Sequence, residues 1–280
     1  ALFFTLERGA TMIYTITFNP AVDLVIQVQN CQLGTLNRSI GEEYVAGGKG
    51  INMSIVLKRL GIDNIATGFL GGFSGKFIEE FLKKEGINPQ FISVEGTTRI
   101  NVKVKGKVET EINAAGPNVE VEKFQQLMNY FEDVLKEGDI VFLAGNAAPG
   151  LDETSYVEIA RLCYARGVKL VLDTTKNSLL ACLPYQPFMI KPNQHELEEL
   201  FGVKIETQEE MLNYAFQLRE KGARNVLISC GGEGAFLVSE TGQVLISNTP
   251  KGTLVNSVGA GDSMLAGFMA KFIDTSDYRK

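Results

Sequence analysis

Histidine, cysteine and tryptophan are scarce in this sequence, which has one histidine, four cysteines and no tryptophan. A Ser-His-Asp triad depends on a histidine with suitable partners, so the lone His195 disfavours a hydrolase of that class. The cysteines lie far apart and form no C-x-x-C pair, which disfavours a zinc site or a thioredoxin-like centre. We expect buried thiols in a reducing cytoplasm.

Net positive charge and long apolar runs are absent as well. The chain has 27 Lys and Arg against 33 Asp and Glu, a formal net charge of -6, so no overall positive field would hold a nucleic acid. No uncharged stretch reaches the roughly 18 to 20 apolar residues that a membrane span requires. We therefore expect neither a nucleic acid nor a membrane as a partner.

The chain is long and apolar enough for a large core, with 280 residues of which 45% are hydrophobic and 21% charged. Such a composition excludes intrinsic disorder. We expect one domain over residues 12–280, starting at a plausible initiator Met12. Residues 1–11 are then an N-terminal extension of unknown origin.

Helical and strand patterns alternate from about residue 120 onward. Residues 121–137 and 151–166 have apolar side chains at helical spacing, and the apolar runs at 140–144 and 169–173 follow them. The same alternation recurs over 208–229. Continuous apolar strands between helices predict an α/β fold with a parallel sheet covered on both faces.

A different pattern precedes this region. Residues 99–105 and 108–112 alternate apolar with polar side chains, which predicts a β-hairpin with one solvated face. Because side chains in a strand alternate between faces, Arg99, Asn101 and Lys103 must share one side. We expect a small cationic sheet outside the main one.

The most specific motif is V-G-A-G-D-S, at residues 258–263, followed at once by an apolar helix. Free backbone N–H groups at a helix N-terminus, with glycines that allow close approach, form an anion site. Asp262 then stands beside that site as an ionised base. The alternative is an aspartate that only caps a helix after a turn.

Two earlier segments also carry polar groups next to regular elements. G-G-K-G at residues 47–50 begins a helix and brings Lys49 near Asn52, which suits a phosphate or a sugar hydroxyl, although the P-loop spacing is absent. Asp23, after the first strand, is placed to accept hydrogen bonds from sugar hydroxyls. The alternatives are a helix-start turn and a turn aspartate.

K-P-N-Q-H-E at residues 191–196 sets Asn193 and Glu196 on one face as a helix begins. They suit a hydrated Mg²⁺, but taken alone a capping box is the better interpretation. S-C-G-G-E-G at residues 229–234 lacks the last glycine of a dinucleotide fingerprint, which disfavours a nicotinamide cofactor. This segment either lets a nucleotide approach the backbone or forms a simple hairpin.

Together the motifs N-P-x-x-D, G-G-K-G-I-N, T-R-I-N-V-K, K-P-N-x-x-E-L and V-G-A-G-D-S, in this order, resemble the ribokinase-like carbohydrate kinases of the phosphofructokinase-B family. The 1-phosphofructokinase subgroup is most similar, followed by the tagatose-6-phosphate kinase subgroup. The resemblance implies a doubly wound, mostly parallel sheet with helices on both faces and a β-sheet lid. Lid strands are expected at about residues 22–29, 38–45 and 99–113, and such lids often form a homodimer contact.

The resemblance also implies roles for individual residues. Asp262 matches the general base. The anion hole matches Gly259, Ala260 and Gly261. The substrate-binding positions, including those for the existing phosphate, match Asp23, Arg38, Gly48, Lys49, Asn52, Arg99 and Lys103. The nucleotide-binding positions match Lys191, Asn193, Ser229, Gly231 and Gly234. The Mg²⁺ positions match Glu196, through water, and Asn193.

The implied reaction is ATP-dependent conversion of fructose 1-phosphate to fructose 1,6-bisphosphate in the cytoplasm, with Mg²⁺. Tagatose 6-phosphate is the alternative substrate. Two departures matter: the family's G-S-L-P loop is G-N-A-A-P at residues 145–149, and the chain ends soon after the Asp262 helix. They motivate another class of function, a non-catalytic sensor that binds sugar phosphate without consuming ATP.

Overall fold

The computed structural model describes residues 11–174, 176–249, 252 and 259–279. Most of the predicted extension, residues 1–10, lies outside the described residues, as do the residues that lead into the glycine-rich motif, 253–258. The rest of that motif, from Gly259 onward, is described.

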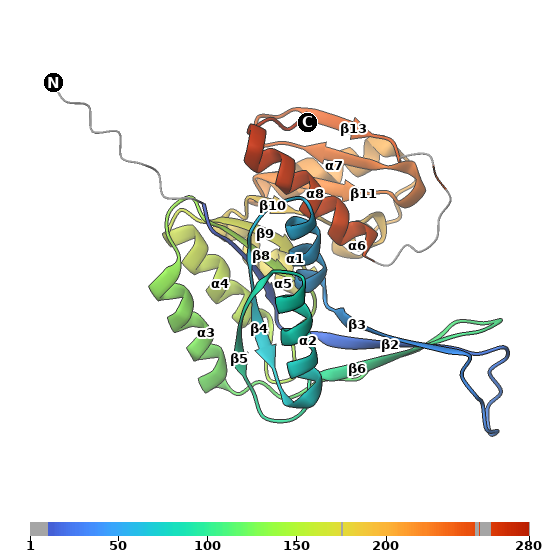
Figure 1. The fold of residues 1–280 in the computed structure, drawn as a ribbon. Coiled ribbons are helices and arrows are strands. Elements are labelled where there is room, and N and C mark those ends of the chain that lie inside the picture. Colours follow the sequence, from blue (N-terminus) through green and yellow to red (C-terminus); the bar gives the residue numbers. More distant parts are fainter. Residues whose placement is uncertain (1–10, 175, 250–251, 253–258, 280) are drawn as a thin grey trace.

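A nine-stranded sheet forms the centre of the molecule, in the order β13-β12-β11-β10-β9-β8-β1-β4-β5 (Figure 1). Its strands are β1 Ile13–Thr17, β4 Ile65–Leu70, β5 Asn88–Ser93, β8 Ile140–Ala144, β9 Lys169–Asp173, β10 Met189–Ile190, β11 Asn225–Ser229, β12 Ala235–Val238 and β13 Val244–Ser247. Pairing is parallel from β5 to β11, and β12 and β13 continue it antiparallel. The predicted parallel sheet is confirmed.

Helices cover both faces of this sheet (Figure 1). They are α1 Lys49–Arg59, α2 Gly72–Lys84, α3 Val121–Val134, α4 Glu153–Ala165, α5 Lys176–Cys182, α6 Gln194–Phe201, α7 Gln208–Glu220 and α8 Ala260–Thr275, with 3₁₀ turns η1 Leu183–Tyr185 and η2 Gly231–Glu233. One apolar cluster packs the sheet against α3 to α7, and two smaller clusters pack it against α1, α2 and α8. No described helix has the length and apolar character that would let it cross a bilayer.

A second sheet of four strands projects from the main body (Figure 1). We call it the lid: β2 Ala21–Gln27, β3 Gly41–Gly47, β6 Arg99–Lys105 and β7 Thr110–Ile112, in the order β3-β2-β6-β7. The predicted β6–β7 hairpin is confirmed, but β7 covers only the last three residues of the predicted strand 108–112. β3 begins at Gly41, three residues later than the predicted start at residue 38. The sheet is mixed because β2 pairs with β6 in parallel.

The two faces of the lid differ in chemistry. Tyr44, Leu24, Val102 and Ile112 are successive register partners across the strands and form one apolar row. Their neighbours Asp23 and Asn101 are also partners and lie on the opposite face, since alternate residues of a strand point to opposite sides. The lid therefore has one polar face and one apolar face.

Candidate active site

A cavity of about 500 Å³ lies where the carboxyl ends of the parallel strands meet the polar face of the lid. Thr17 ends β1, Gly145 follows β8 and Lys191 follows β10, so three strands deliver residues to this cavity. Clefts beyond the carboxyl ends of the strands are the usual ligand sites of such sheets. The predicted residues that line the cavity are Asp23, Gly48, Lys49, Asn52, Arg99, Lys103, Lys191, Gly259, Gly261 and Asp262.

Asp262 lies in the first turn of α8 and has only 6% of its surface exposed. Its Oδ2 accepts a hydrogen bond of 2.8 Å from Nδ2 of Asn52, in the first turn of α1. Burial raises the pKa of Asp262 and the charge of Asp173 adds to this, against the hydrogen bond from Asn52. The carboxyl group is therefore a stronger base than an exposed aspartate.

The backbone at the start of α8 is arranged to leave its N–H groups free. Gly259 is the N-cap, with φ 76°, a left-handed conformation that favours glycine, and a glycine has no side chain with which to cap the helix. The first N–H groups of a helix have no partner within it and carry partial positive charge. Anionic oxygen is thus favoured within reach of Asp262.

Two lysines meet at one buried carboxylate. Nζ of Lys49 lies 3.0 Å from Oδ1 of Asp173, and Nζ of Lys191 lies 3.3 Å from Oδ2. Asp173 ends β9 and is 1% exposed. Burial favours a lower pKa for Lys49, but the charge and hydrogen bond of Asp173 outweigh it, so the pKa is raised and the ammonium stays charged.

The polar face of the lid contributes a second ionic cluster. Asp23 accepts a hydrogen bond of 3.0 Å from Nδ2 of Asn101, and its other oxygen lies 3.1 Å from Nζ of Lys103. Glu111 lies 3.9 Å from the same ammonium. The predicted shared face of β6 therefore borders the cavity, with acceptors and a cation suited to a polar, charged ligand.

The two predicted arginines differ in position. Arg99 lines the cavity, where its Nε and Nη2 donate to the backbone carbonyl of Asn19 at 3.2 and 2.9 Å. Arg38 is exposed in the segment between β2 and β3 and is not among the residues that line the cavity. The structure of this chain alone does not bring Arg38 to the site, so the predicted phosphate contact is not made within it.

A second cavity, of about 460 Å³, adjoins the first on the other side of the α8 N-terminus. The predicted residues that line it are Asn193, Ser229, Gly231, Gly234, Ala260 and Gly261. Gly261 lines both cavities. Apart from Lys191, which lines the first cavity although it was predicted to bind the nucleotide, the residues predicted for the nucleotide and for the sugar line separate cavities that share Gly261.

Asn193 and Glu196 form a capping box at the start of α6, the alternative we favoured from sequence alone. Oδ1 of Asn193 accepts from the Glu196 amide at 2.9 Å, and Oε2 of Glu196 accepts from the Asn193 amide at 2.8 Å. No group of three or more His, Cys, Asp or Glu side chains is gathered for a metal ion within the part of the chain that the structure describes. Any metal here would rely on water and ligand oxygens.

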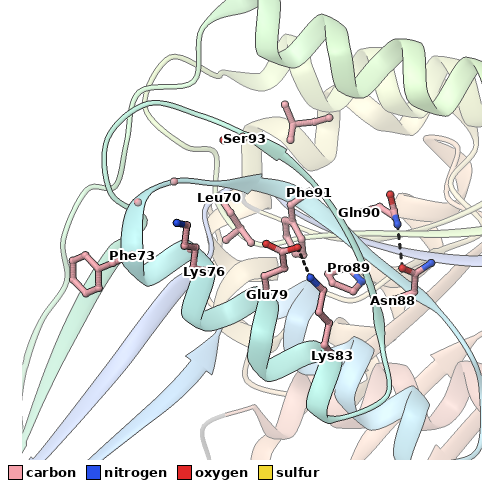
Figure 2. Close-up of a pocket in the computed structure, with 14 residues that line it drawn as sticks. Leu70, Phe73, Lys76, Glu79, Lys83, Asn88, Pro89, Gln90, Phe91 and Ser93 are labelled. Atoms are coloured by element: carbon pink, nitrogen blue, oxygen red, sulfur yellow. Dashed lines mark hydrogen bonds and ion pairs between the residues drawn. The ribbon is translucent and has the colours of Figure 1, made fainter.

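Another cavity, of about 710 Å³, lies between α2 and the edge strand β5 (Figure 2). Its polar side chains largely satisfy each other: Lys83 pairs with Glu79 at 2.8 Å, and Gln90 donates to Asn88 at 3.1 Å. Size alone does not make it the better candidate.

The sequence reasoning missed several residues of the site. Asp173 was assigned only to a strand, yet a charged residue that ends a buried parallel strand is a signal that could have identified it. Asp173 itself is buried and contacts two lysines that line the first cavity. The lining residues to which the sequence assigned no role are Thr17, Asn19, Asn101, Glu111, Asn113, Gly145 and Asn146. Asn146 belongs to the 145–149 loop that departs from the family pattern, so this departure faces the cavity.

Comparison with known proteins gives consistent matches over nearly the whole chain. A family model described as pfkB family carbohydrate kinase matches residues 16–280. A 1-phosphofructokinase of Bacillus subtilis is 46% identical over 92% of this chain and 85% of its own length. A D-tagatose-1-phosphate kinase of Bacillus licheniformis is 39% identical over 93% of this chain and 85% of its own length.

Solved structures agree on the fold. A crystal structure from Staphylococcus aureus, described as that of a phosphofructokinase, is 40% identical in sequence to this chain. Its TM-score is 0.84 over 95% of this chain and 87% of that one. Phosphofructokinase-2 of Escherichia coli, in complex with substrates and products, is 24% identical, with a TM-score of 0.87 over 94% of this chain and 87% of that one. The second likeness concerns the fold alone.

Proposed function

Because the chain belongs to the pfkB family of carbohydrate kinases, we propose that it transfers the γ-phosphoryl group of ATP to a hydroxyl of fructose 1-phosphate, giving fructose 1,6-bisphosphate and ADP. The relatives in Bacillus subtilis and Borreliella burgdorferi, 46% and 39% identical, are both named 1-phosphofructokinase, which supports this substrate. ATP and sugar phosphates are cytoplasmic metabolites, so we assign the activity to the cytoplasm.

One observation carries the proposal: Asp262 lies buried at the start of α8, beside the glycine where the two cavities meet. A sugar hydroxyl in the first cavity and a terminal phosphate in the second would face each other across this point. In phosphoryl transfer, catalysis rests on such positioning and on electrostatic stabilisation more than on covalent chemistry.

The proton of the acceptor hydroxyl moves to Asp262 in our proposed mechanism. A general base needs a pKa low enough for it to be ionised before the reaction and high enough for it to hold the proton afterwards. Burial raises the pKa of Asp262, which favours the second of these requirements. The Asn52 amide fixes one carboxylate oxygen. Oδ1 of Asp262 is then the oxygen that faces the hydroxyl.

Charge on the transferred group is stabilised by the N–H groups of the first turn of α8 and by the ammonium groups of Lys49 and Lys191. Arg99 and Lys103 line the same cavity, and we propose that they bind the phosphate that the substrate already has. The site thus has a separate set of cations for each phosphate.

We further propose that Glu196 and Asn193 hold Mg²⁺ through water. The capping box uses Oε2 of Glu196, and in the described part of the chain Oε1 has no hydrogen-bond partner. Mg²⁺ is commonly bound by one or two carboxylates together with waters and substrate phosphates, so the residues present fit it. Bound there, Mg²⁺ supplies charge neutralisation for the phosphates of ATP.

We also propose that two copies of the chain form a homodimer through the lid. The row Tyr44–Leu24–Val102–Ile112 faces away from the cavity, and Tyr44 and Ile112 are 53% and 62% exposed. An apolar sheet face of this kind gains stability when a second copy covers it. Because Arg38 does not reach its own cavity, we assign its phosphate contact to the cavity of the second copy.

A tagatose phosphate is the second candidate, since relatives that are 39% and 34% identical are named D-tagatose-1-phosphate kinase and tagatose-6-phosphate kinase. An ADP-release assay, with and without Mg²⁺, would compare the 1- and 6-phosphates of fructose and tagatose with free fructose. We expect the highest kcat/KM for fructose 1-phosphate, and no turnover without Mg²⁺. Binding of sugar phosphate with no ADP release from any of them would instead indicate the sensor.

A further inference from the structure

The buried carboxylate of Asp173 contacts two ammonium groups, where a simple ion pair would need only one. Each of its two oxygens meets a different ammonium, Lys49 at 3.0 Å and Lys191 at 3.3 Å. One lysine would neutralise the carboxylate, and Lys191, at 5% exposed, loses most of its hydration where it lies. Burying a second ammonium is costly unless further negative charge compensates it.

The backbone of Asp173 is held firmly. Its carbonyl accepts a hydrogen bond of 2.9 Å from the Gly145 amide, and the amide of Lys191 donates to the adjacent Leu172 carbonyl at 3.3 Å. Asp173 thus ends the central strand β9, which lies between β8 and β10, the strands that precede the cavity residues Gly145 and Lys191. Lysine side chains, by contrast, are flexible and lose rotamer entropy when they are held in one position.

Both lysines line the first cavity, and Lys191 lies beside the glycine that the two cavities share. A Cβ added at Gly261, which lines both cavities, would stand 3.3 Å from Nζ of Lys191. Lys49 lines the first cavity and reaches Asp173 from the start of α1. Asp262 is close enough that the charges of Asp173, Lys49 and Lys191 all act on it.

We propose that Asp173 is a positioning residue that holds the ammonium groups of Lys49 and Lys191 at the junction of the two cavities, where the transferred phosphoryl group passes. This inference rests on the proposed kinase activity. It adds to that activity the residue that orders two flexible cations before the reaction.

The charges of the cluster agree with this role. Before the reaction, two carboxylates, Asp173 and Asp262, face two ammonium groups. When Asp262 takes the proton of the acceptor hydroxyl it becomes neutral, and the net charge of the cluster changes from zero to one positive charge. That charge stands where the phosphoryl oxygens are, without any side chain having to move.

The primary test is Asp173→Asn, because asparagine has the same shape but turns an NH₂ group toward one ammonium. Loss of a residue that orients others typically costs 10- to 100-fold, so we expect kcat to fall by about that much while both KM values stay within about threefold. The matched control is Asp63→Asn, in an exposed Lys58–Asp63 pair of 2.6 Å, which should leave kcat unchanged. Unchanged kcat in Asp173→Asn would overturn the proposal.

A double-mutant cycle separates positioning from a purely structural role. If Asp173 acts through Lys49, then Lys49→Met combined with Asp173→Asn should lose much less than the product of the two single losses. Multiplicative losses, or recovery of the single Asp173→Asn variant at high Mg²⁺, would assign Asp173 another role and overturn the proposal. Should Asp173→Asn not fold, the second variant is Lys49→Met, at a side chain that is 38% exposed, and unchanged kcat there would overturn the proposal.

Failure of the proposed activity can be told from failure of this inference. If the unsubstituted protein turns over no sugar phosphate, the proposed function fails, and ¹³C NMR of the methylated lysines still reports on Asp173. The pKa of Lys49 should then fall in Asp173→Asn, since Asp173 is the charge that raises it. An equal pKa in both proteins would show that Asp173 does not hold Lys49.

Discussion

Asn52 donates a hydrogen bond of 2.8 Å to the carboxylate of Asp262, which joins the first turn of α1 to the first turn of α8 across 210 residues of sequence. The same amide was expected, from sequence, to contact the sugar. In the structure Nδ2 donates to the carboxylate, so Asn52 acts on the proposed base.

Asp262→Asn should abolish most turnover. A general base typically contributes 10²- to 10⁴-fold, so kcat for fructose 1-phosphate should fall by about that factor, with KM nearly unchanged. Steady-state kinetics with ADP release measures this, and circular dichroism checks that the variant is folded. Full activity in a folded variant would contradict the assignment of Asp262 as the base.

The pH dependence of kcat/KM should reflect the raised pKa of Asp262. The ionised carboxylate is the active form, so activity is lost as the pH falls through a pKa above that of an ordinary aspartate. In Asn52→Ala the hydrogen bond that lowers this pKa is gone, and the acid limb should move to higher pH. A limb that stays in place would show that Asn52 does not act on the carboxylate.

Gly261→Ala should impair activity without impairing stability. Alanine is favoured over glycine within a helix by about 1 kcal/mol, but its Cβ would stand 3.3 Å from Nζ of Lys191 and narrow the junction of the cavities. Gly267→Ala, on the same helix, meets nothing within 4 Å and is the matched control. We expect both variants to melt at or above the wild-type temperature and only Gly261→Ala to lose kcat. Equal kcat values would show that the junction tolerates a methyl group.

Arg99→Ala should weaken binding of phosphorylated sugars selectively. A charge-assisted hydrogen bond contributes roughly 1.5 to 3 kcal/mol, or about 10- to 150-fold in Kd. Isothermal titration with fructose 1-phosphate and with fructose separates the two cases. An equal loss for fructose would mean that Arg99 serves the backbone carbonyl of Asn19 rather than the substrate.

Ile112→Asp should shift the proposed dimer to monomers, because it places a charge in the apolar row of the lid. Ile246→Asp is a close control, since Ile246 also lies in a strand and both isoleucines are 62% exposed. Light scattering after size exclusion gives the mass of each variant. A wild-type monomer, or two variants of unchanged mass, would rule out association through this row.

Much of the main domain was predictable from the sequence. β8 and β9 coincide with the predicted apolar runs, and β11 ends the alternation predicted over residues 208–229, because continuous burial on both faces leaves few alternatives to a strand. Parallel pairing of β2 with β6 was not predictable, since it joins segments 78 residues apart and depends on the whole fold. The family resemblance, confirmed over residues 16–280, identified the motifs around both cavities.

The contacts between residues of different motifs were not predictable from the sequence. The capping box at Asn193 and Glu196 is a local pattern, and local reasoning favoured it. The contacts of Asp173 with two lysines, 124 residues before it and 18 after, depend on three segments meeting. Arg38 was assigned by resemblance alone, and it lies outside the cavity, exposed in the segment between β2 and β3.

The lid is a single layer whose strands present Asp23 and Asn101 on one side and Leu24 and Val102 on the other. A shift of any of these strands therefore moves both surfaces together. If two copies associate through the apolar face, dilution that separates them also makes the polar face, which borders the sugar cavity, less rigidly held. Apparent affinity for the sugar phosphate then becomes a property of the protein's own concentration.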